Sequence, residues 1–144
     1  MSSWTPRELK QALIAAGIEV YRVHGSRVLV ADRVRENLIM DSGVAVVAGD
    51  GCAVRFVVRT QASQFPGESE PQLFDRARRL AKATAKRGYS EVETAVVPVP
   101  NPGDRTTTLD TWYEVVFEKP VEGEKEILEE IHFALRLEKS AAPG

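Results

Sequence analysis

The stretch GVAVVAGDGCAVRFVVRTQ, residues 43–61, decides the fold of this chain. Gly49-Asp50-Gly51 separates two apolar segments, 43–48 and 52–61, and its glycines supply the positive φ angles that a tight hairpin turn needs. In the second segment apolar residues alternate with polar ones, which is typical of a strand that buries one face and leaves the other in water. The stretch therefore predicts an antiparallel hairpin inside a larger sheet.

A helix is expected near the N-terminus. Thr5-Pro6-Arg7-Glu8 is typical of a helix start, because threonine caps the first amides, proline suits the first helical turn and glutamate completes a capping box. Apolar residues then recur at helical spacing until Gly17, which offers a left-handed stop. The pattern predicts a short amphipathic helix.

Two strands and an ambiguous link connect this helix to the first stretch. Segments 18–23 and 27–31 are rich in β-branched and aromatic residues, and His24-Gly25-Ser26 between them predicts a tight turn. The link 32–42 either holds a short helix, capped by its leading aspartate, or runs as an irregular connection. The short helix is the preferred interpretation.

A second helix is expected after the break at Phe65-Pro66-Gly67. Ser69 and Gln72 form another capping-box arrangement, and helical spacing then continues through residues 70–88. Gly88 is typical of a helix end. This helix therefore spans about five turns.

The C-terminal part of the chain returns to strand and ends in a helix. Residues 89–97 predict one strand, and the proline-rich segment 98–108 predicts a loop because proline lacks the amide that a ladder needs. Alternation over 112–119 predicts another strand, and a final helix runs through Leu137.

These elements predict an α+β fold. We expect an antiparallel sheet of five to six strands with three main helices packed largely on one face, in the order α-β-β-(short α)-β-β-α-β-β-α. Residues 1–139 are expected to form a single domain, and 140–144 a disordered tail. This order resembles that of bacterial secretion-chaperone domains and, less closely, that of roadblock-type domains. The resemblance covers element order and no sequence motif, so it assigns no functional residue.

Composition excludes several classes of protein. Charged residues make up 28% of the chain and the net charge is -2, far from the bias of a disordered or strongly basic chain. Apolar runs such as 44–47 fall short of the ~20 residues that cross a bilayer, and the polar start 1–7 is unlike a signal peptide. We expect a cytoplasmic protein without a membrane segment.

Candidate reaction centres are incomplete in the sequence. Glu129-Glu130-Ile131-His132 contains the Glu-x-x-His spacing of di-iron helices but lacks the second copy that such centres need. Cys52, the only cysteine, lies in a predicted strand and is expected to be a packed thiol. His24 and Ser26 lack any companion motif for nucleophilic catalysis. We expect no catalytic residue, no metal, no cofactor and no enzymatic activity.

The second helix concentrates positive charge. Arg76, Arg79 and Lys82 belong to a group of six cations on its outer surface. Such a group could follow a phosphate backbone, so nucleic-acid binding is one hypothesis. The preferred interpretation is that the glutamates of the final helix, at positions 122–130, neutralise these cations.

The final helix and one tryptophan give the best indication of a partner. Phe133 and Leu137 extend the apolar arc of that helix beyond what one sheet normally covers, which favours homodimerisation. Trp112, beside the proline-rich loop, is an alternative interface anchor or a core residue. The sequence therefore favours a non-enzymatic interaction module, an adaptor or chaperone-like domain, that binds another protein or its own copy. A small-molecule pocket between sheet and helices is the alternative hypothesis.

Overall fold

The structure is a computed structural model that describes residues 3–141. It holds a six-stranded antiparallel sheet in the order β1-β2-β3-β4-β6-β5 with three main helices, which confirms the expected fold class and the order of these main elements. The elements are α1 (Pro6–Ala15), β1 (Val20–His24), β2 (Arg27–Arg35), β3 (Leu38–Val47), β4 (Cys52–Gln61), α2 (Glu70–Leu80), β5 (Ser90–Asn101), β6 (Asp104–Val121) and α3 (Gly123–Ala141). Two 3₁₀ turns, η1 (Ala62–Gln64) and η2 (Lys82–Arg87), flank α2.

The chain divides into two compact units. The first unit comprises Met1–Phe56 and Glu118–Gly144, and the second comprises Val57–Phe117. Strands β4 and β6 contribute residues to both units, because each is long enough to run from one into the other.

The first unit begins with the expected capping box. Thr5 Oγ1 accepts a hydrogen bond from the Glu8 amide at 3.1 Å, and Glu8 Oε1 accepts one from the Thr5 amide at 3.2 Å. Leu9 and Leu13, one turn apart, are buried against the sheet. Helix α1 therefore forms where the sequence predicted it.

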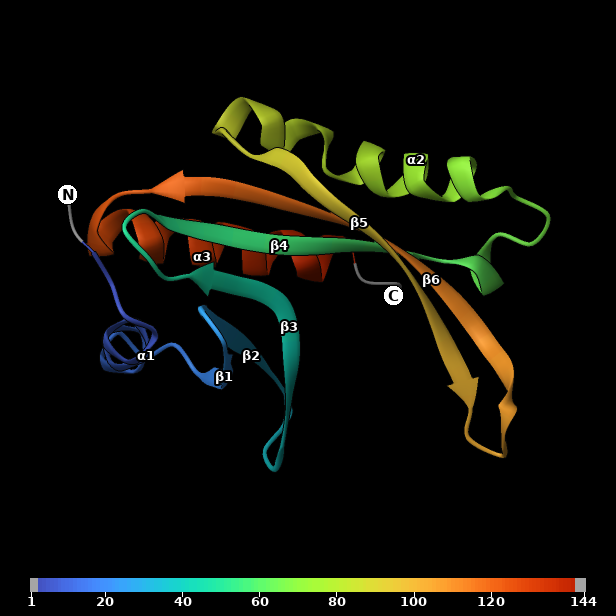
Figure 1. Cartoon of the computed structure of the whole chain (residues 1–144), viewed down its shortest axis with the longest axis horizontal. Coiled ribbons are helices and arrows are strands. Elements are labelled where there is room, and N and C mark those ends of the chain that lie inside the picture. The colour runs from blue at the N-terminus through green and yellow to red at the C-terminus, as the bar shows by residue number, and fades with distance from the viewer. Residues whose placement is uncertain (1–2, 142–144) are drawn as a thin grey trace. The chain divides into compact units, whose positions relative to one another are not determined.

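The core of the first unit lies between its strands and α3, which runs behind β3 and the first half of β4 in Figure 1. Alternate residues of the strands point into this core, as in the hairpin predicted around Gly49-Asp50-Gly51. The most deeply buried side chains of the unit include Val28, Val44, Val46, Val54, Phe56, Ile127 and Ile131.

The short helix expected within 32–42 is wrong. Strand β2 continues to Arg35 and β3 begins at Leu38, so the segment is a second half of the β2–β3 hairpin with Glu36-Asn37 at its turn. Asp32, which the sequence suggested as a helix cap, pairs with Met40 across the ladder. The ladder satisfies the backbone groups that a helix would otherwise have bonded.

The second unit contains α2. Its capping box is present, with Ser69 accepting a hydrogen bond from the Gln72 amide. Leu73 and Ala77 are buried, and the Phe74 ring meets Tyr113 of β6 edge-on, with centroids 5.3 Å apart. The α-helix ends earlier than expected, because residues 82–87 continue as the 3₁₀ turn η2 before Gly88 (φ 106) ends the segment.

The proline-rich loop expected over 98–108 is also wrong. Strand β5 runs to Asn101 and β6 starts at Asp104, so the prolines lie in a long hairpin. Because Pro98 and Pro100 are two apart, their missing amides fall on the same edge of β5, and β5 is the outermost strand of the sheet. An edge strand tolerates proline on its outer side because no neighbour needs that amide.

The end of the chain differs from the expected tail. Helix α3 runs four residues past Leu137 to Ala141, so Ser140 and Ala141 are helical, and residues 142–144 lie outside the described part. Among residues 3–141, every helix is too short or too polar to cross a lipid bilayer.

Candidate interaction surface

The interaction residues expected on α3 are largely covered within the chain. Phe133 and Leu137 are half-buried, as are the neighbouring Leu128 and Leu135. Within the part of α3 whose side chains are described, no large apolar residue is among those that are more than a third exposed. The apolar arc of α3 therefore leaves less surface for a partner than its sequence suggested.

Trp112 is held in a contact of its own unit. The guanidinium of Arg59 lies 3.8 Å from the centroid of the Trp112 ring, and Arg59 also donates to the Glu114 carboxylate at 2.8 Å. A cation stacked on an indole face and fixed by a carboxylate is a stable local arrangement. This contact accounts for the half-buried position of Trp112.

Two arginines of α2 pair with acids of their own unit. Arg76 pairs with Glu68 at 2.8 Å and covers the Phe65 ring at 3.8 Å. Arg78 pairs with Glu91 at 2.7 Å, and the hydrogen bond between them raises the pKa of Arg78 and lowers that of Glu91. The acids of these two pairs all belong to the second unit.

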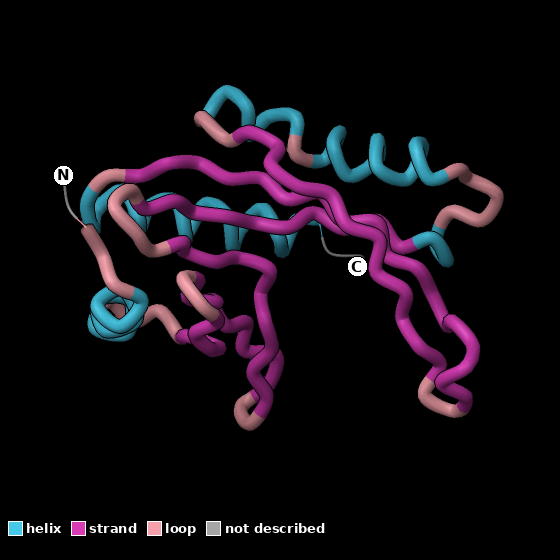
Figure 2. The backbone as a smooth tube through the Cα atoms, in the orientation of Figure 1, coloured by secondary structure: helices cyan, strands magenta, loops and turns pink. Residues whose placement is uncertain are grey.

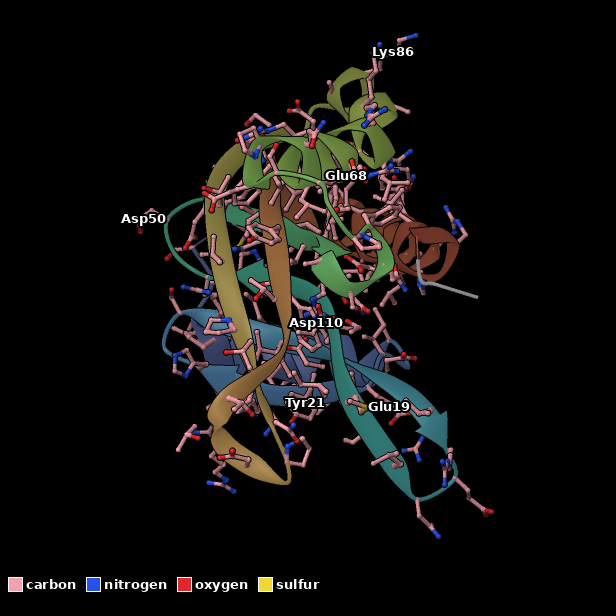
Figure 3. The ribbon with its side chains drawn as sticks, turned by 90° about the vertical axis from the view of Figure 1, so that its right-hand side faces the viewer. Glu19, Tyr21, Asp50, Glu68, Lys86 and Asp110 are labelled. Carbon is pink, nitrogen blue, oxygen red and sulfur yellow. The ribbon has the colours of Figure 1, made fainter. Side chains whose placement is uncertain are left out.

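The remaining expected cations are exposed. Arg79 donates only a long hydrogen bond, 3.4 Å, to the Asp75 carbonyl, and Lys82 is exposed at the start of η2. Figure 3 shows Lys86 projecting outward from the tip of the same turn. These residues form a solvated face whose charge is partly balanced by Asp75.

Groups that the sequence raised as reaction centres lie apart or are buried. Burial raises the pKa of the Cys52 thiol, which disfavours the reactive thiolate. His132 and Glu129 are exposed on α3, and His24 and Ser26 are exposed around the β1–β2 turn. Within the described residues, no group of three or more His, Cys, Asp and Glu side chains is arranged to hold a metal.

A hollow lies beside Cys52 in the first unit. It measures about 250 Å³ and is lined by Trp4, Asp50, Gly51, Cys52, Val121, Glu122 and Gly123. Pockets that enclose small molecules are larger, about 300–1,000 Å³, and mostly apolar. The hollow therefore offers little support for a small-molecule site.

A group of exposed apolar side chains lies on the distal half of the β2–β3 hairpin. We call residues 32–41 the arm. All of its residues are exposed, including four large apolar side chains whose exposed fractions are 50% for Val34, 41% for Leu38, 36% for Ile39 and 53% for Met40. Figure 1 shows this hairpin extending beyond the paired part of β3. Apolar side chains gathered in this way mark a binding surface.

A bulge in β3 sets the direction of the arm. Leu29 pairs with Ala45 and Ala31 pairs with Asp41, so β3 contains two more residues than β2 between these two pairs. The extra residues include Gly43, whose φ of 87 is one that glycine adopts readily, and Ser42 Oγ donates to the Val30 carbonyl at 2.7 Å. Such insertions bend a strand, and Figure 2 shows the sharp turn of β3 there.

The arm has two unpaired edges. On one side β3 pairs with β4 only from Val44 to Val47, and on the other β1 pairs with β2 only as far as Val30, within the described ladders. The arm is therefore a two-stranded ribbon that exposes backbone donors and acceptors along both of its sides.

The apolar side chains of the arm favour one face. Strand alternation places Leu38 and Met40 together, and Met40 lies opposite Asp32, whose side of β2 also carries Val34. Ile39 lies on the other face, opposite Arg33. One face of the ribbon thus presents three large apolar groups in a row.

An ion pair braces the base of the arm. Arg33 donates to the Glu19 carboxylate at 2.6 and 2.7 Å and to the Glu36 carbonyl at 2.6 Å, and Figure 3 shows Glu19 beside the hairpin. The hydrogen bond from Arg33 lowers the pKa of Glu19. The Arg33 guanidinium joins Glu19, which precedes β1, to the turn of the arm, and so restrains the ribbon although both side chains are exposed.

The two outer strands of the sheet are protected, in contrast to the arm. Strand β5 carries Pro98 and Pro100, and β1 is short, has a register shift after Val20 and exposes Arg22 and His24. Prolines, bulges and charges at an edge discourage further strand pairing. The β3 edge of the arm lacks proline and carries the run Leu38-Ile39-Met40.

The sequence of the arm is compatible with a strand as well as with a helix. The β-branched Val34 lies between the charged residues Arg33 and Arg35, and Asn37 lies at the turn. An apolar run closed by Gly43 is equally consistent with a bulged strand. Exposure of that run could not be predicted, because it depends on the bend that the bulge produces.

No protein-family model matches the sequence, and comparisons with curated proteins and with solved structures give no match either. A functional proposal therefore depends on the geometry described above.

Proposed function

We propose that this chain is a non-enzymatic protein-interaction module, and that the arm is its docking element. The observation that carries the proposal is the conjunction of exposed apolar side chains with unpaired strand edges over residues 32–41. Either feature alone is common at protein surfaces, but together they match the way an extended segment adds to a sheet.

The arm offers both parts of strand addition. Its free backbone groups supply hydrogen bonds, and the row of Val34, Leu38 and Met40 supplies apolar contact for alternate side chains of a partner. Burying these three half-exposed side chains contributes about 2–4 kcal/mol in total. The brace between Arg33 and Glu19 supports this role, because a restrained ribbon loses less entropy on binding.

The charged groups of the structure also support a binding role rather than a catalytic one. Arg59, Arg76 and Arg78 are held by carboxylates or aromatic rings that maintain the local fold. Such arrangements position elements, and they present no nucleophile with an adjoining base.

A site-specific photocrosslinker tests this function. A benzophenone amino acid at Met40 on the arm, incorporated in the native cells, is expected to give discrete covalent adducts on irradiation. The matched control places the same group at Leu109, which is 59% exposed in β6 and lies outside the arm. The proposal is supported if adducts form at Met40 and are lost when Ile39→Lys, which places a charge on the arm, is added to the same chain. Equal labelling at both positions, or none at Met40, contradicts it.

A further inference from the structure

We infer that the arm's partner is a second copy of this chain, which pairs with it edge to edge through Asn37 and the adjoining residues 38–41 of β3. The inference rests on the proposed function, since it names the occupant of the same surface. It follows from the direction of the backbone groups and from the side chains that symmetric pairing would bring together.

The register shows which residues present their backbone groups at the free edge of β3. The Ala31 amide donates to the Glu19 carbonyl at 2.9 Å, so Ala31 points away from β3. Asp41 is the register partner of Ala31, and in an antiparallel ladder both members of such a pair point outward. By alternation, Ile39 also directs its backbone donor and acceptor to the free edge.

This edge is complementary to itself. A two-fold axis through Ile39 places Ile39 opposite Ile39 of the second copy, with both backbones correctly oriented for a pair of hydrogen bonds. The same register places Leu38 opposite Met40 of the second copy, and Asn37 opposite its Asp41. All of these cross-strand pairs are apolar or can form a hydrogen bond, and none opposes like charges.

The opposite edge of the arm is not complementary to itself. Arg33 is the arm residue of β2 that points outward there, because it alternates in register with Ala31, before the register shift that separates it from Arg35. A symmetric antiparallel register centred on this edge places Arg33 opposite Arg33 of the second copy, and like charges in that position repel. Arg33 is also held by Glu19 and by the Glu36 carbonyl. Charge therefore selects β3 as the pairing edge.

Pairing through β3 would join two ribbons into a four-stranded sheet. Val34, Leu38 and Met40 of each copy would then form one continuous apolar face. The contact is short, so it falls at the low end of interface sizes, below about 1,200 Å². A dissociation constant of about 1–100 μM is the corresponding expectation.

Disulfide trapping tests the register. Ile39→Cys and Met40→Cys are each introduced with Cys52→Ala and oxidised at about 100 μM. In the inferred register position 39 faces itself at ~5.5 Å between Cα atoms, within disulfide range, whereas position 40 faces position 38. Ile39→Cys is therefore expected to form covalent dimer about tenfold faster than Met40→Cys. Random collision would give the reverse order, because Met40 is more exposed than Ile39, 53% against 36%.

Light scattering supplies the second measurement. The unmodified chain is expected to change from one-chain to two-chain mass over the micromolar range, and Ile39→Lys to remain at one-chain mass with an unchanged circular dichroism spectrum. Equal or faster oxidation of Met40→Cys, or one-chain mass for the unmodified chain up to about 500 μM, overturns the inference. In that case, Met40 photoadducts with a different protein would leave the proposed function standing, and the lack of any adduct would remove both.

Discussion

Asp110 ties the start of η1 to β6 within the second unit. Its carboxylate accepts hydrogen bonds from the Ser63 amide at 3.0 Å, the Ser63 hydroxyl at 2.8 Å and the Thr111 amide at 2.8 Å. Burial acts to raise the pKa of Asp110, but hydrogen bonds from Ser63, Thr111 and Trp112 outweigh it, so the pKa lies below its ordinary value of 3.8.

This lowered pKa predicts the pH dependence of one variant. A carboxyl whose pKa is depressed by folding stabilises the protein above its unfolded pKa, and that contribution is lost as pH falls through the folded pKa. Asp110→Asn should therefore lower the free energy of unfolding by about 1–2 kcal/mol at pH 7. Urea titrations should show this difference shrinking below about pH 4. A difference that stays constant down to pH 2 would show that the carboxylate charge is not responsible.

Lys119 and Glu130 form the most buried ion pair among those described. Their Nζ and Oε2 atoms are 3.0 Å apart, and the side chains are 18% and 4% exposed. Removing one partner from such a pair leaves a charge in a poorly solvated place. Lys119→Met should cost about 3 kcal/mol, whereas Lys119→Met with Glu130→Leu should recover most of that loss. Chemical unfolding of both variants measures this, and a double variant no more stable than the single one would contradict it.

Contacts between residues that are close in the sequence could be predicted, but contacts between residues that are far apart in the sequence could not. Both capping boxes, at Thr5 and Ser69, depend on residues three apart and were found where expected. The stacking of Arg59 on Trp112 joins positions far apart in the chain, and depends on the register between two strands. The sequence indicated that Trp112 could be an interface anchor. It did not indicate that Arg59 stacks on the Trp112 ring.

At the scale of elements, the β5 prolines show how context changes the meaning of a residue. In isolation, prolines two apart indicate a loop. On the outermost strand they fit the ladder, because residues two apart share one side of the strand and the outer side of β5 has no neighbour that needs their amides. The sequence could not distinguish these cases, since it does not state which strand is at the edge.

Replacing these prolines should expose a competent edge. Pro98→Val together with Pro100→Val restores two outward amides and adds β-branched side chains, so the variant should associate or aggregate at concentrations where the native chain does not. Dynamic light scattering against concentration measures this. Adding Val96→Lys, at an exposed position of the same strand, should restore a uniform size. If the proline variant stays uniform without the lysine, the prolines do not protect the edge.

Gly43 is the residue on which the bend of the arm depends. Its φ is +87, and an added Cβ would lie 3.4 Å from the Glu138 carboxyl carbon. Gly43→Ala should therefore lower the free energy of unfolding by about 1–2 kcal/mol. Gly51→Ala is the matched control, because Gly51 is not in the left-handed region and a Cβ there meets nothing within 4 Å. Thermal unfolding compares the two, and equal losses would show that the left-handed conformation is not the cause.

At the scale of the whole molecule, strand alternation was enough to predict the sheet, and helical spacing with capping residues was enough to predict the three helices. The two compact units were not predicted, because the strands that contribute to both, β4 and β6, show no break in their pattern. The candidate surface was not predicted either. Sequence pattern favoured α3, whose Phe133 and Leu137 are half-buried, whereas the exposed arm lies beyond a bulge of β3 that the sequence does not reveal.

Amide hydrogen exchange along the arm tests the central claim most directly. If the β3 edge pairs with a second copy, the amides of Ile39 and Asp41 should exchange about tenfold more slowly at 1 mM than at 1 μM, because they gain partners only in the dimer. The Met40 amide, which already faces β2, should exchange at the same rate at both concentrations. Identical rates for Ile39 and Asp41 at both concentrations would contradict the claim.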